Sequence, residues 1–175
     1  GVLSDEEDGT YHAVKRLAQA GRCNIAFVND DETESEQHKL NGYRRAIQEC
    51  GLPERCYRAE RSIAGGQFAT TRILRQDPRT DAIVFTEDTT AVGGLHTLLI
   101  TGKRIPEDVA VIGCNNSVYC TICYPQLSSI DNSLHETGRT AAQQMIRLLN
   151  HEPDVEKTVC LPCRLVLRDT TPPMV

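Results

Sequence analysis

Residues 82–113 read AIVFTEDTTAVGGLHTLLITGKRIPEDVAVIG, a stretch in which a strand pattern, a helix pattern and a second strand pattern follow one another. The runs at 82–85 and 109–113 are short, continuous and apolar, as in parallel strands that are buried on both faces. Between them, Asp88 is a good N-cap residue, and apolar residues at helical spacing follow it as far as Gly102. The stretch therefore predicts a strand–helix–strand unit.

The same alternation continues on both sides of this unit. Residues 24–29 form another apolar run with strand-favouring residues, and helical patterns end at Gly21, at Gly51 and at Gln76. Strands that alternate with helices in this way predict a doubly wound α/β fold, built on parallel sheets. In such folds, ligands bind beyond the carboxyl ends of the strands.

The last third of the chain carries one more helix pattern. It is expected to begin near Ser133, with Glu136 three residues later as a capping box. Residues 159–167 are expected to be extended, with an interruption at Pro162. The opening Val2-Leu3 reads as a short piece of strand that leads straight into the first helix, which suggests that neighbouring strands lie upstream of these residues.

Composition excludes several function classes. The 175 residues include 19 Lys+Arg and 24 Asp+Glu, a formal net charge of −5, and no basic cluster is visible. DNA binding by these residues themselves is therefore not expected. The longest uncharged apolar stretch, residues 91–100, is too short and too interrupted to span a bilayer, and no charged-then-apolar leader opens the sequence. We expect a cytoplasmic protein with reduced thiols and no membrane partner.

The eight cysteines raise the question of a metal site. Cys120-x-x-Cys123 and Cys160-x-x-Cys163 have a spacing that occurs in zinc sites, but the pairs are further apart than in the usual zinc ribbon. We expect no metal and interpret these thiols as small buried side chains or as thiols near a subunit interface. The sequence contains no nucleophile elbow, zinc-protease motif or phosphate loop, so no catalytic residue and no cofactor are expected.

Several segments, taken together, resemble the effector-binding domain of LacI/GalR-type transcriptional regulators. They follow one another in the family's order across essentially the whole chain. The segments are residues 4–28, 40–46 (LNGYRRA), 80–95, 102–113 (GKRIPEDVAVIG), 125–130 (PQLSSI) and 161–171 (LPCRLVLRDTT). Each segment alone is a weak signal, and the run at 102–113 is the most specific of them.

The resemblance implies a two-lobed, periplasmic-binding-protein-like fold that is truncated at its N-terminus. The helix-turn-helix headpiece of such regulators and the start of their N-terminal subdomain have no counterpart in these residues. Residues 1–30 and 128–157 would form a partial N-terminal subdomain. Residues 31–127 and 158–175 would form the C-terminal subdomain.

The resemblance also places an effector site in the cleft between the subdomains. The candidate effector-binding residues are Thr33, Ser35, Lys39, Arg61, Glu87, Asn115 and Asn132. Lys39 stands where the family usually has an arginine, and a lysine offers a point charge in place of a fork of donors. The alternative interpretation of Lys39 is a solvated side chain on a helix face.

Glu87 and Asn115 stand where the family commonly has an amide and an acid, so the two chemistries are exchanged. If both face the cleft, they offer a carboxylate that accepts hydrogen bonds and an amide that both donates and accepts. The alternative for Glu87 is that it only complements a helix N-terminus. Arg61 takes a place where an aromatic ring often stacks on the ligand, and it would favour a polar or anionic effector unless it is simply a surface residue.

The resemblance predicts a function in transcription regulation. The chain would bind a small polar metabolite (a sugar, a sugar derivative, a nucleoside or a purine) and shift the population of lobe arrangements that a DNA-binding headpiece senses. Operator DNA would be a partner only through that headpiece. A homodimer is expected through residues 88–102 and 117–124. The alternatives are a sugar-binding protein of a transport system and, with no catalytic constellation in its support, an enzyme.

Overall fold

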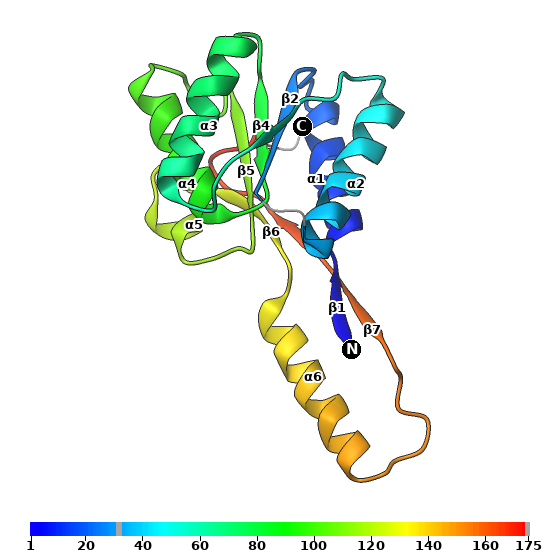
Figure 1. Cartoon of the computed structure of the whole chain (residues 1–175). Coiled ribbons are helices and arrows are strands. Elements are labelled where there is room, and N and C mark those ends of the chain that lie inside the picture. Colours follow the sequence, from blue (N-terminus) through cyan, green and yellow to red (C-terminus); the bar gives the residue numbers. More distant parts are fainter. Residues whose placement is uncertain (31–32, 174–175) are drawn as a thin grey trace.

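In the computed structural model, which describes residues 1–30 and 33–173, most of the chain forms a doubly wound α/β lobe (Figure 1). Its six-stranded sheet has the order β3-β2-β4-β5-β6-β8, and all neighbours are parallel except β6 and β8. The strands are β2 (Ile25–Asn29), β3 (Cys56–Arg58), β4 (Ala82–Phe85), β5 (Ala110–Cys114), β6 (Ser128–Asp131) and β8 (Arg164–Val166). The predicted fold class is thereby confirmed.

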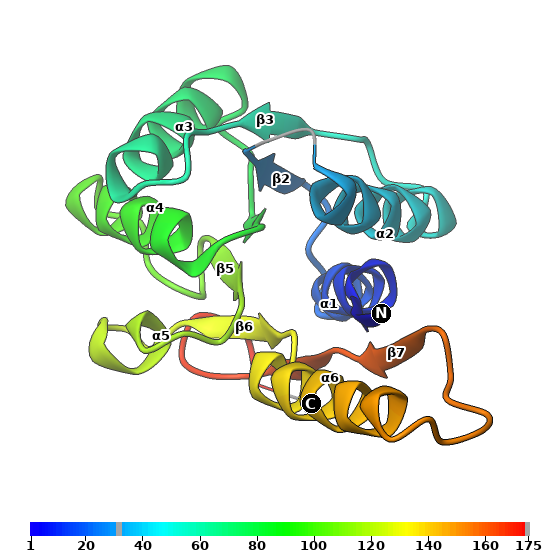
Figure 2. The same ribbon diagram turned by 60° about the horizontal axis from the view of Figure 1, so that its bottom comes forward.

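Helices cover both faces of this sheet (Figure 2). They are α1 (Glu6–Gln19), α2 (Glu34–Cys50), α3 (Ile63–Gln76), α4 (Asp88–Ile100) and the short α5 (Tyr119–Ile122). Successive strand residues alternate between two cores, because side chains of a strand point to opposite faces. Phe27 packs with residues of α1 and α2, whereas Val28 packs with residues of α3 and α4. Among residues 1–30 and 33–173, every helix is too short or too polar to span a bilayer.

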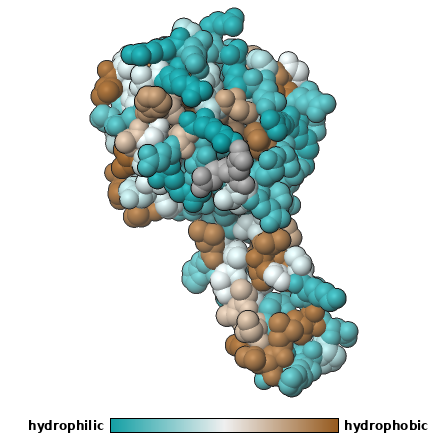
Figure 3. All heavy atoms as spheres, viewed as in Figure 1, coloured by the Kyte–Doolittle hydropathy of each residue, from teal (hydrophilic) through white to brown (hydrophobic). Residues whose placement is uncertain are grey.

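A second, smaller lobe extends from one edge of the large sheet (Figure 1). In it, β1 (Val2–Asp5) pairs in parallel with β7 (Val159–Pro162), and α6 (Leu134–Leu149) packs beside β1. None of the sixteen residues of α6 is buried. Figure 3 shows apolar side chains gathered on this small lobe. Those of α6 that are more than half exposed are Leu134, Met145, Ile146, Leu148 and Leu149.

The boundary between the lobes differs from the predicted one. The sequence-based division assigns β2 and β6 to the N-terminal subdomain, but both strands belong to the large sheet. It assigns residues 158–162 to the C-terminal subdomain, but β7 pairs with β1 in the small lobe. The chain therefore crosses between the lobes at residues 5–6, 131–134 and 162–164. Apolar runs predict where strands lie, but they carry no information on which strands pair.

Two predicted helix starts are also corrected. The N-cap of α4 is Glu87 rather than Asp88, whose buried carboxylate instead accepts hydrogen bonds from the Ser117 backbone N–H (2.7 Å) and the Ser129 hydroxyl (2.7 Å). The expected capping box at α6 does not form. Ser133 has a left-handed backbone (φ 52°) and makes no side-chain cap hydrogen bond, and Glu136 pairs with Arg139.

Candidate functional site

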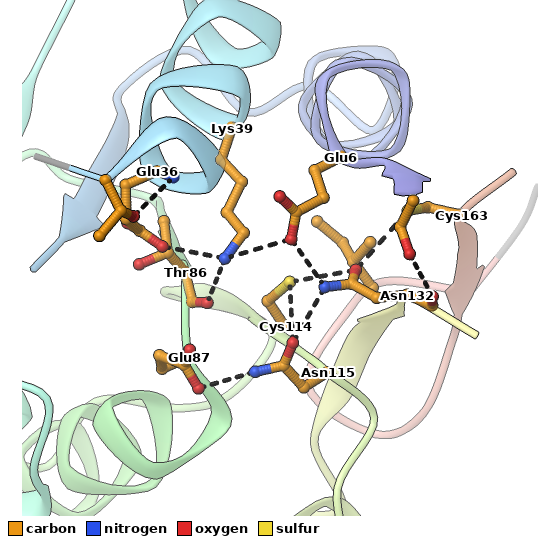
Figure 4. Close-up of polar contacts among 12 residues, drawn as sticks. Glu6, Glu36, Lys39, Thr86, Glu87, Cys114, Asn115, Asn132 and Cys163 are labelled. Carbon is orange, nitrogen blue, oxygen red and sulfur yellow. Dashed lines mark hydrogen bonds and ion pairs between the residues drawn. The ribbon is translucent and has the colours of Figure 1, made fainter. Parts of the chain in front are cut away.

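Polar side chains gather at the edge of the large sheet that faces the small lobe. The carboxyl ends of β4, β5 and β6 meet there, and the side chains that follow parallel strands lie close together. Glu87 follows β4, Asn115 follows β5 directly and Asn132 follows β6 directly, while α1 and α2 contribute the rest. We call six connected side chains the polar network: Glu6, Glu36, Lys39, Glu87, Asn115 and Asn132 (Figure 4).

Lys39 lies buried within this network, with 3% of its surface exposed. Its Nζ donates to Glu36 Oε1 at 2.9 Å and to the Thr86 carbonyl at 3.4 Å, and it lies 3.6 Å from Glu6 Oε1. Burial by itself lowers the pKa of Lys39, but the surrounding Cys114, Glu36 and Glu6 outweigh burial and raise that pKa. Lys39 is therefore a charged, internally paired lysine, and the alternative of a solvated helix-face residue is wrong.

The amide of Asn132 connects the network across the junction of the lobes. Its Nδ2 donates to Glu6 Oε1 (3.1 Å) and to Asn115 Oδ1 (2.9 Å). Its Oδ1 accepts from the thiols of Cys114 (3.5 Å) and Cys163 (3.6 Å). Glu6, Asn132 and Cys163 come from the three different crossings between the lobes.

Asn115 carries the network on to Glu87. Its Nδ2 donates to Glu87 Oε2 at 2.7 Å, and its backbone φ of 94° lies in the left-handed region that asparagine tolerates better than most residues. Glu87 is the N-cap residue of α4 without a side-chain cap hydrogen bond, and the contact of its carboxylate to Asn115 shows that it does more than complement a helix N-terminus. Burial raises the pKa of Glu87, although Arg61 and Lys39 act in the opposite direction.

Arg61 lies at the margin of the site, with half of its side chain exposed. Its guanidinium pairs with Asp30 and lies 3.5 Å from Glu87 Oε1. The hydrogen bond to Asp30 opposes the effect of burial and raises the pKa of Arg61. The guanidinium is thus held by carboxylates at the place where the resemblance implied a stacking group.

Besides Arg61, two more predicted site residues lie outside the polar network. Thr33 caps α2, where its hydroxyl accepts from the Glu36 backbone N–H at 3.3 Å. Ser35 lines a pocket of about 570 Å³ that it shares with Glu6 and His38. The sequence-based reasoning missed Glu6 and Glu36. The signal for Glu36 is its position three residues before Lys39, which places both side chains on one helix face.

The cysteine pairs do not assemble into a shared site. Within residues 1–30 and 33–173, no group of three or more His, Cys, Asp or Glu side chains is placed to hold a metal ion. All eight cysteines are free thiols. Cys120 is buried under α4, whereas Cys163 reaches the polar network through Asn132.

Comparison with known proteins identifies the fold family. The model of the periplasmic binding protein-like domain matches residues 14–171. The chain belongs to this family. The similar proteins include HTH-type and LacI family transcriptional regulators. They confirm the resemblance to LacI-type effector domains that the sequence indicated.

An HTH-type transcriptional regulator of Lachnoclostridium phytofermentans is 31% identical over 173 residues, which cover 97% of this chain and 52% of the relative. The structure of a LacI family transcriptional regulator from Enterococcus faecium with bound ribose superposes with a TM-score of 0.89 at 26% identity, covering 99% of this chain and 66% of the other. The structure of a LacI family transcriptional regulator from Arthrobacter sp. FB24 in complex with lactose superposes with a TM-score of 0.88 at 28% identity. The match covers 98% of this chain and 66% of the other.

This domain spans about half the length of the curated relatives that it matches. The relatives are named as regulators, in agreement with the prediction of a regulatory domain rather than an enzyme.

Proposed function

We propose that this chain is the effector-binding domain of a LacI-family transcription regulator, in which the polar network binds a small polar metabolite. The observation that carries the proposal is the position of the network, at the carboxyl ends of parallel strands and at the junction of two lobes. Binding sites of doubly wound folds lie at such edges. Carboxylates and amides suit hydroxyl-rich ligands, because they accept and donate hydrogen bonds. Ribose and lactose in the two related structures support a sugar or sugar derivative as the ligand.

The ligand would act by changing the angle between the lobes. Glu6 follows β1 and Asn132 precedes α6, so a molecule bound to both contacts two of the crossings between lobes. A ligand that binds one lobe arrangement more tightly shifts the population toward it, and only this difference in affinity can be transmitted. In the whole protein, the transmitted change would reach a DNA-binding headpiece, and the setting would be the cytoplasm.

The proposal includes a homodimer. Exposed apolar side chains lie on the large lobe at the end of α4 (Leu99 and Ile100) and, separately, around α5 (Val118, Ile122 and Tyr124). Exposed apolar surfaces of this kind mark protein interaction sites. Sedimentation velocity should show a dimer for the wild type. Ile122→Asp should dissociate this dimer, whereas the control Ile146→Asp on α6 should leave it intact. A wild-type protein that stays monomeric at high concentration contradicts the proposed dimer.

Ligand binding itself is tested by thermal denaturation with ribose, lactose and a wider set of neutral sugars. A ligand at one hundred times its Kd should stabilise the folded protein by about 2.7 kcal/mol, because it binds only the folded state. Asn132→Ala should abolish the shift, since it removes contacts to Glu6 and Asn115. The matched control Asn150→Ala, at the far end of α6, should keep it. A shift that survives Asn132→Ala places the ligand elsewhere.

A further inference from the structure

The cations at the candidate site are already neutralised by the protein's own carboxylates. Lys39 lies between Glu36 and Glu6, at 2.9 and 3.6 Å. Arg61 lies between Asp30 and Glu87. These are four carboxylates against two cations, so the formal charge of the group is negative.

The N–H donors of the site are also occupied. The Nδ2 of Asn115 donates to Glu87, and the Nδ2 of Asn132 donates to Glu6 and to Asn115. A phosphate or carboxylate on a ligand would have to displace these contacts, because anions are bound by N–H donors and cations.

Acceptors, in contrast, are in surplus. The side chain of Glu36 is only 1% exposed, and its Oε2 atom has no hydrogen-bond partner. A buried acceptor without a donor is costly, so it favours a ligand that brings an N–H or O–H group. An unpartnered oxygen is evidence independent of the net charge, since it concerns hydrogen bonding.

The adjoining pocket has the same character. Its volume is about 570 Å³, and it shares Glu6 with the polar network. Carboxylates from the start of α1 and of α2 line it, and its arginine, Arg45, pairs with Glu7 (3.2 Å) and Asp8 (2.9 Å). The pocket beside the network therefore also has an excess of negative charge.

We propose that the effector carries an amine, as in an amino sugar, and that the site discriminates against phosphorylated or carboxylated metabolites. An ammonium group supplies three donors and a positive charge, which fit surplus acceptors and a negative site. This inference rests on the proposed effector site. Of the polar or anionic effector that Arg61 suggested, it keeps the polar character and replaces the negative charge with a positive one.

The test is isothermal titration of the full gene product with matched sugars. Glucose, galactose and mannose are each compared with their 2-amino and 6-phosphate forms. We expect at least one amino sugar to bind ten-fold or more tightly than its neutral parent, and the phosphates to bind more weakly than either. The amine preference should decrease as ionic strength rises, because salt screens charge interactions.

A variant separates charge from shape. Glu87→Gln keeps the size of the side chain and should bring the affinities for amino and neutral sugar close together, whereas Glu54→Gln, an exposed glutamate paired with Arg44, should not. Circular dichroism melting verifies that the variants fold. Tighter binding of the neutral or phosphorylated forms overturns this inference and leaves the effector domain standing. If no sugar of any form binds, the proposed function itself fails.

Discussion

The large and small lobes contain helices of similar length, but the helices of the large lobe are far more deeply buried than the helix of the small lobe. In α3 of the large lobe, five residues of fourteen are buried, whereas α6 of the small lobe has none among sixteen. Both helices carry apolar residues at helical spacing. The difference lies in what surrounds them, because α3 packs on a six-stranded sheet and on α4, while α6 has only a two-stranded sheet beside it. Apolar periodicity thus identifies a helix face that is suited to burial, but it does not show that another element packs against that face.

The sharpest test of this comparison removes one apolar side chain from each lobe. Phe27→Ala should lower the free energy of unfolding by about 3–5 kcal/mol, because the ring is fully buried and stacks on Tyr43 at 4.8 Å between centroids. Leu149→Ala on α6 should change it by no more than about 0.5 kcal/mol, since the side chain is 70% exposed. Urea denaturation measures both values. Equal losses would mean that α6 is covered in solution.

A second test adds a methyl group where two helices touch. A Cβ at position 66 would lie 1.9 Å from the Thr90 carbonyl oxygen, a backbone atom that cannot rotate away. Gly66→Ala should therefore separate α3 from α4 and cost about 1–3 kcal/mol. Its effect is read from the urea midpoint, and an unchanged midpoint would show that the helices pack less closely than the structure has them.

The matched change in the small lobe should have the opposite sign. A Cβ at position 138 in α6 meets nothing within 4 Å. Gly138→Ala should stabilise α6 by about 0.5–1 kcal/mol, because alanine loses less backbone entropy in a helix than glycine does. Amide hydrogen exchange along α6 should slow accordingly. Faster exchange would indicate that another surface lies against this helix.

The smallest expected effect concerns the edge between the lobes, where burial is partial. Because burial raises the pKa of Glu87, its ionised form is less favourable in the folded than in the unfolded state. The wild type should therefore lose stability as pH rises from the ordinary glutamate range through the raised pKa, and Glu87→Gln should not. The stability of the variant relative to wild type should rise over that interval and stay constant below it. A flat difference across the interval would contradict the assigned shift.

Much of the fold could be predicted from local patterns. The strand at 82–85 and the helix end at Gly51, which has a left-handed φ of 64°, lie where the sequence places them. Strand pairing could not be predicted, since neither the apolar run of β2 nor the mixed SSID sequence of β6 indicates which lobe the strand joins. The predicted capping box at Ser133 was also wrong, since this residue has a left-handed backbone and makes no side-chain cap hydrogen bond.

The side chains that meet in the candidate site could be predicted only in part. The network connects Lys39, Glu87, Asn115 and Asn132, which the resemblance singled out, with Arg61 at its margin. What the sequence could not indicate is pairing between distant segments. Glu6 is separated from Asn132 by 126 positions, and only the crossing of the chain between lobes brings them to 3.1 Å.

The Asn132 side chain offers a direct view of lobe movement. One amide contacts Glu6 and Cys163 and belongs itself to the remaining crossing, so all three connections meet at a single group. If the lobes change their angle as proposed, we expect these contacts of Asn132 to change with it. The chemical shift of the Asn132 side-chain NH₂ group, measured by NMR on a ¹⁵N-labelled sample, should therefore report a change in the angle between the lobes without an attached probe.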